Sequence, residues 1–315
     1  MKKNSKIFVA GHNGMVGSAI HRTLKNYGYH NILSQDRILL DLSNKDAVFE
    51  YFQINKPEYV FLAAAKVGGI LANKSYPVEF ILENLKIQNS IIEASANFDV
   101  KRLLFLGSSC VYPKNSQQPI KEEYLLSGYL EETNKAYALA KIAGIELCNA
   151  YHKQYGKEFF TVMPCNLYGI NDNYDLENSH VIPALIRKFH EAKVYEYEQV
   201  EIWGDGTPLR EFLFVDDLAM ACIFLMNKEL PSNNIINVGS DDEFSIFEIA
   251  LLIKNIVGYE GKLVFNKDYP NGVKRKKLDT TQINKLGWRP SMNIIKGIKL
   301  AYEDFKKRYC LVNKI

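Results

Sequence analysis

Short apolar runs alternate with amphipathic stretches along the first half of the chain. The runs have the length and composition of buried strands, and helical spacing marks the stretches between them. The runs are residues 6–10, 59–63, 102–107 and 159–163. Strands that alternate with helices in this way predict an α/β fold with a doubly wound parallel sheet.

The spacing of apolar residues becomes irregular after residue 165, and this marks a second region. Two helical patterns occur there: Val181, Ile182, Leu185, Ile186 and Phe189, and later Ile294, Ile298, Ala301, Tyr302 and Phe305. We expect residues 1–165 to form the main lobe. Residues 166–315 should form mainly a smaller α/β substrate-binding lobe, with some segments returning to the first. Because ligands of open α/β sheets bind at the carboxyl ends of the strands, a lobe over that edge would create a cleft.

A glycine-rich turn follows the first predicted strand. The segment Gly11-His12-Asn13-Gly14-Met15-Val16-Gly17 has G-x-x-G-x-x-G spacing and leads into a stretch of good helix formers. Such glycines allow a pyrophosphate to approach the N–H groups at the positive end of a helix. The pattern also fits a turn that serves packing only. Its place at the first strand–helix junction favours a Rossmann-type dinucleotide-binding lobe.

The residues that would contact the adenosine ribose are ambiguous. An acid that binds the ribose falls about 20 residues after the glycines, where Asp36 and Arg37 stand side by side. Asp36 could accept a hydrogen bond from a 2′-hydroxyl, which favours NAD, whereas Arg37 could pair with a 2′-phosphate, which favours NADP. Either could also be a solvated loop charge. Asp41 is a further candidate near the adenine.

Composition excludes several classes of protein. The 315 residues are 47% hydrophobic with a net charge of +3, so nothing favours binding to nucleic acid or to a membrane surface. No apolar stretch is long enough for a signal peptide or a membrane span. The five cysteines are scattered without a C-x-x-C pair, which argues against disulfides and against a metal site. We expect a cytoplasmic protein with reduced thiols and no metal.

A tyrosine and a lysine are placed for proton transfer. Tyr137 and Lys141 are four residues apart, on one face of a predicted helix. A nearby cation lowers the cost of a phenolate, so Tyr137 can exchange a proton with a carbonyl oxygen while hydride moves to carbon. Ser108, at the end of the predicted strand 102–107, offers a hydroxyl to the same hydrogen bond.

These residues resemble those of extended short-chain dehydrogenase/reductases, and longer strings narrow the resemblance to the GDP-L-fucose synthase family. The strings are AAAKVGGI (63–70), LGSSCVYP (106–113), NSHVIP (178–183), WG (203–204) and TPLREF (207–212). The match extends over residues 6–288. The resemblance implies epimerisation of C3 and C5 of a GDP-4-keto-6-deoxy sugar, followed by reduction at C4 with NADPH.

The resemblance also assigns residues. The catalytic set that it implies is Ser108, Tyr137 and Lys141 for reduction, with Cys110 and His180 for proton exchange. The cofactor set is Gly11, Gly14, Met15, Val16, Gly17, Arg37, Asp41, Leu42, Ala63, Lys141, Pro164, Asn166, Leu167 and His180. The substrate set is Asn166, Lys188, Trp203, Arg210 and Lys276. Helical segments 77–98 and 133–155 would pair two copies into a homodimer, as in the family.

Physical arguments support these assignments and leave alternatives. Cations such as Lys188 and Arg210 suit a diphosphate, and the ring of Trp203 could stack on a base or a sugar. Trp203 could instead be a core residue, and Lys188 a solvated helix charge. Cys110, two residues after Ser108, occupies the place of a glutamate base in related dehydratases; the alternative is a buried, inert thiol. His180 could simply flank a helix N-terminus.

The chain departs from the family at three places. Asn13 stands where an arginine often helps to hold a 2′-phosphate, and Asn271 and Lys274 replace an Asp and a Pro near the substrate. NADH therefore stays open beside NADPH. We expect reduction of the 4-keto group of a GDP-linked deoxy sugar, hexose or heptose, with prior C3/C5 epimerisation. The alternatives are a C4-reductase without epimerase activity and a non-catalytic dinucleotide sensor.

Overall fold

The main lobe is built on a six-stranded, all-parallel sheet. The computed structural model describes residues 1–230, 234–269 and 271–309. The sheet has the order β2-β1-β3-β4-β5-β9. Its strands are β1 (Ile7–Ala10), β2 (Ile32–Leu33), β3 (Tyr59–Leu62), β4 (Arg102–Leu106), β5 (Glu158–Pro164) and β9 (Ile235–Val238). The predicted parallel sheet is confirmed, and its predicted strand ends agree with the structure to within one residue.

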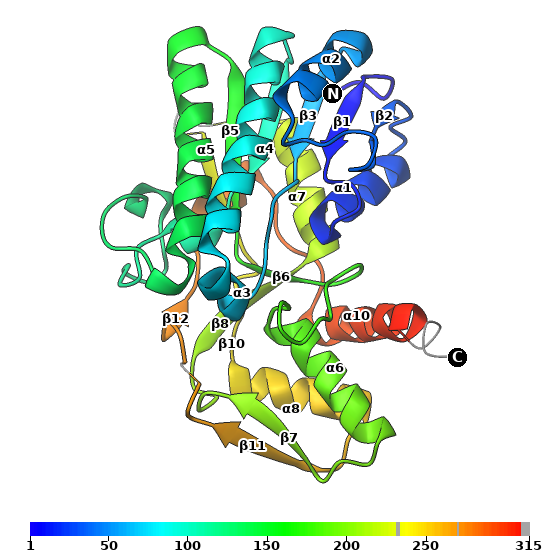
Figure 1. Ribbon diagram of the computed structural model, residues 1–315, viewed down its shortest axis with the longest axis vertical. Helices are drawn as coiled ribbons and strands as arrows, with labels where there is room; N and C mark the ends of the chain where they lie inside the picture. The colour runs from blue at the N-terminus through cyan, green and yellow to red at the C-terminus, as the bar shows by residue number, and fades with distance from the viewer. Residues whose placement is uncertain (231–233, 270, 310–315) are drawn as a thin grey trace.

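Two groups of helices cover the main sheet. Helix α1 (Met15–Asn26) packs against α7 (Val215–Met226), whereas α4 (Pro77–Asn97) packs against both α2 (Lys45–Asn55) and α5 (Lys135–Tyr155) (Figure 1). Right-handed crossovers explain this division. The connection from β1 to β2 crosses the sheet in one direction, whereas the connections from β3 to β4 and from β4 to β5 cross it in the other, so their helices lie on opposite faces. The elements α7 and β9 come from the second half of the chain, yet their apolar side chains belong to the core of the first lobe.

The smaller lobe lies at the edge of the main sheet formed by the carboxyl ends of its strands (Figure 1). Its central strand β8 pairs in parallel with β6 and β12 and antiparallel with β10, while β7 pairs in parallel with β11. The strands are β6 (Asn166–Tyr168), β7 (Gln199–Trp203), β8 (Leu209–Phe214), β10 (Glu243–Ser245), β11 (Lys262–Asn266) and β12 (Arg275–Lys276). A second apolar core lies between these strands and the helices α6 (Val181–Val194), α8 (Ile246–Val257) and α10 (Ile294–Tyr309). The two helical patterns predicted in this region are α6 and α10.

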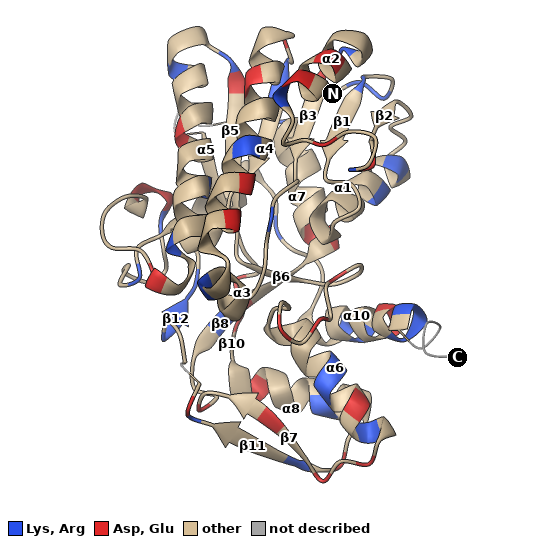
Figure 2. Cartoon of the chain, in the orientation of Figure 1, with Lys and Arg blue, Asp and Glu red and all other residues tan. Residues whose placement is uncertain are grey.

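Short helical turns complete the chain between these elements. They are α3 (Ile70–Ser75), α9 (Thr281–Leu286) and the 3₁₀ turns Ser109–Val111, Glu122–Tyr124 and Glu132–Asn134. Cys110, Cys148, Cys165 and Cys222 are free thiols, and Cys310 lies outside the described residues. Within the described ranges, no helix is long and apolar enough to cross a membrane. Acidic and basic residues are interspersed along both lobes in the cartoon of Figure 2.

The glycine-rich turn after β1 is fixed by packing at its two ends and left open in the middle. Gly11 has φ +89°, and a Cβ there would lie 2.7 Å from the backbone of Ala64 in the loop after β3. A Cβ at Gly17 would overlap the carbonyl oxygen of Gly11, because the first turn of α1 packs directly on the glycine-rich turn. A Cβ at Gly14 would meet that oxygen at an ordinary 3.5 Å. The protein itself therefore requires glycine at positions 11 and 17, but not at position 14.

This difference predicts unequal costs for two alanine substitutions in one turn. Gly17→Ala should lower the free energy of unfolding by about 1–3 kcal/mol, because backbone must move to admit the methyl group. Gly14→Ala should stay within about 1 kcal/mol of wild type, since φ there is negative and space is available. Urea unfolding followed by circular dichroism measures both. Equal destabilisation by the two variants would contradict this account of the turn.

Candidate active site

The N-terminus of α1 offers backbone N–H groups to an anion. The first N–H groups of a helix have no acceptor within it, and the residue preceding α1, Gly14, supplies no side chain to cap them. Met15, Val16 and Gly17 form the first turn, which contains no acidic residue. The partial positive charge of the helix end and the open space at Gly14 fit the pyrophosphate of a dinucleotide. The cofactor residues predicted around the turn therefore lie together.

The predicted ribose-binding segment contacts the glycine-rich turn. The Asp36 carboxylate accepts a hydrogen bond from Asn13 Nδ2 at 2.7 Å and lies 3.4 Å from His12 Nε2. Arg37, next to it, is exposed. Asp36 therefore already has partners within the turn. Sequence reasoning did not foresee the His12 and Asn13 contacts, because they join segments about two dozen residues apart.

The remaining cofactor candidates near β1 occupy different settings. The Asp41 carboxylate accepts hydrogen bonds from the Ser43 N–H at 2.9 Å and hydroxyl at 2.8 Å, and these bonds lower the pKa of Asp41. Leu42, beside it, is half-buried. Ala63 follows the end of β3 and donates its N–H to Ala10 of β1. Ala63 thus lies at the carboxyl edge, beside the glycine-rich turn.

Tyr137 and Lys141 lie together on α5, as their spacing predicts. The Lys141 ammonium is 5.9 Å from the centre of the Tyr137 ring and donates a hydrogen bond to the Leu106 carbonyl at 2.7 Å. Lys141 is only 2% exposed, and burial lowers its pKa to about 7. Burial raises the pKa of Tyr137, and proximity to Cys110 raises it further. Tyr137 is therefore held in its protonated form, ready to act as a donor.

Ser108 connects Tyr137 to Cys110. It follows β4 and precedes the 3₁₀ turn Ser109–Val111, where its hydroxyl accepts the Cys110 N–H at 3.2 Å. Its hydroxyl also interacts with the Tyr137 phenol and the Cys110 thiol, and it acts to lower the pKa of each. A single hydroxyl thus contacts both groups that the sequence proposed for proton transfer.

Cys110 differs from the other thiols of the described chain. It is half-buried, whereas Cys148 and Cys222 are fully buried and have raised pKa values as a result. Burial also acts to raise the pKa of Cys110, but the charge of Lys276, 3.5 Å away, the bond to Ser108 and the charge of Arg210 together outweigh it and lower the pKa. The alternative of an inert, buried cysteine does not fit these surroundings.

His180 directly precedes α6, but its side chain does not cap that helix. The residue is exposed, yet desolvation by the surrounding protein, followed by the charge of Lys276, lowers its pKa. The segment before it is tied to the loop after β3, because Gly69 N–H donates to the Asn178 carbonyl at 2.9 Å. Two of the strings that carried the resemblance, residues 63–70 and 178–183, are therefore in contact.

An exposed aromatic pair lies beside Lys188. Trp203 is 41% exposed and stacks on Tyr269, with ring centres 4.3 Å apart and planes within 5°. Lys188 lies 5.2 Å from the Trp203 ring centre and donates to the Glu201 carbonyl at 3.0 Å. The alternative of Trp203 as a core residue is therefore wrong. Tyr269 was missed, because only its stacking on a strand 66 residues earlier makes it notable.

The other substrate candidates lie on adjacent strands of the smaller lobe. Lys276 of β12 is in register with Arg210 of β8, and Asn166 of β6 is in register with Phe212 of β8. Asn166 also donates to the Glu211 carbonyl at 3.0 Å. The chain reaches this sheet directly from β5, whose last residue is Pro164, so Leu167 of β6 also lies at the junction of the lobes. The assignment of these residues to the substrate site stays a prediction.

The departures from the family have visible structural roles. Asn271 accepts a hydrogen bond from the Asp205 N–H at 2.9 Å through its side-chain oxygen, which an aspartate would also supply. A Cβ on Gly204 would overlap that oxygen, so the two turns pack closely. The Lys274 side chain is exposed, and its carbonyl accepts the Leu209 N–H at the start of β8.

Comparisons with known proteins identify the family of the chain. Residues 7–239 match the model of the "NAD dependent epimerase/dehydratase family". GDP-L-fucose synthase 1 of Arabidopsis thaliana is 50% identical over 98% of this chain and 95% of its own length. GDP-L-fucose synthase of Escherichia coli K12 is 47% identical over 95% and 96%.

Solved structures show the same likeness. The GDP-6-OMe-4-keto-L-xylo-heptose reductase from C. jejuni superimposes with a TM-score of 0.92 at 39% identity, covering 98% of this chain and 99% of that one. The GDP-mannoheptose C4 reductase MlghC from Campylobacter jejuni, with NADP bound, gives 0.89 at 42% identity, covering 97% and 99%. From these matches over nearly its whole length, the chain belongs to the NAD-dependent epimerase/dehydratase family and, within it, to the GDP-L-fucose synthase family.

Proposed function

We propose that this enzyme reduces the 4-keto group of a GDP-linked 4-keto-deoxy sugar with NADPH, after epimerising the sugar at C3 or C5. The observation that carries the proposal is the continuous group Tyr137, Ser108 and Cys110, with Lys276 against the thiol. It combines a proton donor for a carbonyl oxygen with a group that can take a proton from the adjacent carbon. The sugar is a hexose or a heptose, since relatives named for each share the fold.

The reductive half of the reaction uses the protonated phenol. When bound, NADPH supplies the hydride. Tyr137 donates its proton to the ketone oxygen as negative charge develops there, and Ser108 offers that oxygen a second hydrogen bond. Lys141 stabilises the phenolate that remains, because an ammonium nearby lowers the cost of the negative charge.

The epimerising half uses acidity next to the ketone. A proton on the carbon beside a carbonyl is acidic, because the resulting carbanion is stabilised as an enolate. Cys110, with its lowered pKa, takes that proton as a thiolate, and His180 returns one from the other face. The lowered pKa of His180 makes its cation a stronger acid, though a less abundant one near neutral pH.

The nucleotide part of the substrate is proposed to contact the smaller lobe. Arg210 and Lys188 present cations suited to a diphosphate, and the partly exposed Trp203 and Tyr269 rings offer an aromatic surface. Lys276 has three donors, so it can contact a phosphate while it remains near Cys110.

Two alternatives are less well supported. A C4-reductase without epimerase activity would need Tyr137, Ser108 and Lys141, but it would have no use for the lowered pKa of Cys110. A non-catalytic dinucleotide sensor would have no use for a buried ammonium such as Lys141, because burying a charge is costly.

The preference for NADPH rests on the partners of Asp36. Asn13 and His12 already occupy this carboxylate, so it is poorly placed to accept from a ribose 2′-hydroxyl. Arg37 extends into solvent beside it and can pair with a 2′-phosphate in place of the arginine that the family often has at position 13.

We further propose a homodimer in the cytoplasm, paired through α4 and α5. These helices pack side by side (Figure 1). They carry exposed apolar residues, including Val78, Leu82 and Leu139. Two copies related by a two-fold axis would bury these residues in a four-helix contact. The proposal includes no nucleic-acid or membrane partner and no metal.

Tyr137→Phe should slow hydride transfer roughly 100-fold or more, because the ketone oxygen would lose its proton donor. Single-turnover oxidation of NADPH with a GDP-4-keto sugar measures the effect. Tyr129→Phe, at an almost fully exposed tyrosine, serves as the control and should behave as wild type. An unchanged rate for Tyr137→Phe would remove Tyr137 from the mechanism.

Incubating the keto sugar with the enzyme in deuterated water, without NADPH, should place deuterium at C3 or C5. Cys110→Ser should abolish the exchange, yet it should still reduce a sugar that has already been epimerised, because Tyr137, Ser108 and Lys141 remain. NMR of the recovered sugar and NADPH oxidation measure the two steps. Ready reduction by wild type without any deuterium uptake would establish the C4-reductase alternative.

Arg37→Ala should weaken NADPH binding about 10- to 100-fold, the equivalent of about 1.5–3 kcal/mol for a lost charge-assisted contact. NADH lacks the 2′-phosphate, so its affinity should hardly change and serves as the internal control. Fluorescence titration of the reduced cofactors measures both. A wild-type preference for NADH would instead identify Asp36 as the ribose contact and overturn the NADPH proposal.

A further inference from the structure

We propose that Lys276 is the counter-ion of a Cys110 thiolate, and that Glu211 is a positioning residue that holds Lys276 in place through the end of β12. The two side chains come from segments 166 residues apart, and the Lys276 ammonium lies 3.5 Å from the Cys110 sulfur. Both residues are half-buried, so water screens their interaction only in part. The role of this pair in proton exchange rests on the proposed function, but the ion pair itself does not.

The groups around Cys110 favour the charged form of the thiol. Ser108, in the same segment, acts to lower the pKa of the thiol, and the positive charge of Arg210 of β8 acts in the same direction. Tyr137 of α5 stays protonated and therefore adds no competing negative charge. His180, which precedes α6, is also influenced by the charge of Lys276, and its lowered pKa keeps it mostly neutral. Lys276 is the nearest of these cations, so most of the effect depends on where its ammonium lies.

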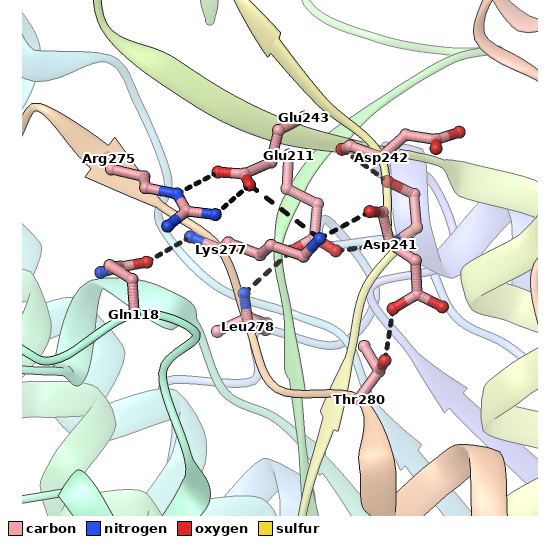
Figure 3. A network of polar contacts seen from close by, with 10 residues as sticks. Gln118, Glu211, Asp241, Asp242, Glu243, Arg275, Lys277, Leu278 and Thr280 are labelled. Atoms are coloured by element: carbon pink, nitrogen blue, oxygen red, sulfur yellow. Dashed lines mark hydrogen bonds and ion pairs between the residues drawn. The ribbon is translucent and has the colours of Figure 1, made fainter.

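The strand that carries Lys276 is too short to position it alone. Strand β12 has two residues, Arg275 and Lys276, and pairs with β8 over that length only. Neighbouring residues of a strand point to opposite faces. Lys276 faces Cys110, and the residues on either side of it point into a separate polar network, shown in Figure 3.

That network fixes both flanks of Lys276. The Arg275 guanidinium makes two bonds to the Glu243 carboxylate, at 2.8 and 2.5 Å. On the other side, Lys277 donates its ammonium to the Asp241 carbonyl at 2.7 Å and its N–H to the Gln118 side chain at 2.8 Å. The strand is thereby tied to β10, to the turn before it and to the loop before α5.

Glu211 lies at the centre of the network. Its side chain is fully buried, and one carboxylate oxygen accepts the N–H groups of Ser240 and Asp241 at 2.9 and 3.0 Å. The other oxygen accepts the Leu278 N–H at 3.1 Å, two residues after Lys276. Burial raises the pKa of Glu211 to about 7, so the charged form is costly and these three donors offset that cost only in part. The buried carboxylate therefore links the turn at residues 240–241 to the segment that follows β12.

The chemistry that this arrangement supports is balanced. The thiolate electron pair takes the α-proton and forms an S–H bond, while the electrons of the C–H bond move into the enolate. Return of a proton to that carbon restores the ketone, with no net oxidation. Lys276 stays protonated throughout, and its role is to make the thiolate available at neutral pH.

The test is the pH dependence of Cys110 alkylation by iodoacetamide, with peptide mass spectrometry identifying the modified cysteine. Because the thiolate is the reactive form, the rate follows the ionisation of Cys110. Lys276→Met should move the midpoint to higher pH and slow alkylation at pH 7 roughly 10-fold or more. Lys276→Arg should restore most of the rate. Lys274→Met removes the same charge from an exposed position in the same segment and should leave the midpoint unchanged.

Glu211→Gln tests the positioning role, because an amide cannot accept all three N–H groups. We expect the Cys110 midpoint to shift in the same direction as in Lys276→Met, but by less. Should this variant fail to fold, Gln118→Ala loosens the same strand at the Lys277 N–H and should give a similar small shift. If the variant that folds has an unchanged Cys110 midpoint, the positioning role of Glu211 is overturned. An unchanged midpoint in Lys276→Met overturns the ion pair.

The outcome is separable from that of the proposed function, because alkylation requires no substrate. A shifted midpoint without deuterium exchange at the sugar would support the ion pair and refute epimerisation. Deuterium exchange by the wild type, with no shift of the midpoint in Lys276→Met, would support epimerisation and refute the ion pair.

Discussion

An ammonium group buried between α5 and β4 is the interaction on which the rest of the site depends. Lys141 is almost inaccessible to water and donates to the carbonyl of Leu106, the last residue of β4. This bond fixes α5 against the strand from which Ser108 and Cys110 emerge. Burying a charge is costly, and the lowered pKa of Lys141 records that cost. The buried bond holds the Tyr137 phenol, on the helix, at a fixed distance from the Ser108 hydroxyl and the Cys110 thiol, which follow the strand.

The smaller lobe changes what this core can do. In the proposed function, the phenol, hydroxyl and ammonium of the main lobe serve proton transfer to the ketone oxygen. Strands β8 and β12 add Arg210 and Lys276, whose positive charges oppose the effect of burial on Cys110. The same cations suit a diphosphate, so in the proposed function nucleotide binding and thiol ionisation would use one set of side chains. The position of Lys276 therefore depends on the register of β12, although this strand has only two residues.

The smaller lobe also carries the surface that we propose for the nucleotide part of the substrate. Trp203, Tyr269 and Lys188 form an exposed surface on β7, the loop after β11 and α6. Asn271, where the family usually has an aspartate, bonds to a neighbouring backbone N–H.

The sequence by itself determined the features that depend on local spacing. Apolar runs located the strands, glycine spacing located the turn before α1, and a four-residue interval placed Tyr137 and Lys141 on one helix face. The resemblance then supplied the names of most site residues, including Cys110, His180 and Lys276. Only the tertiary structure decided how they interact: that Lys276 lies against Cys110, that Tyr269 stacks on Trp203, that Asp36 is held by His12 and Asn13, and that Glu211 is buried. Each of these contacts joins segments remote along the chain, and such contacts are set by strand order and register, which the periodicity of a single segment does not encode.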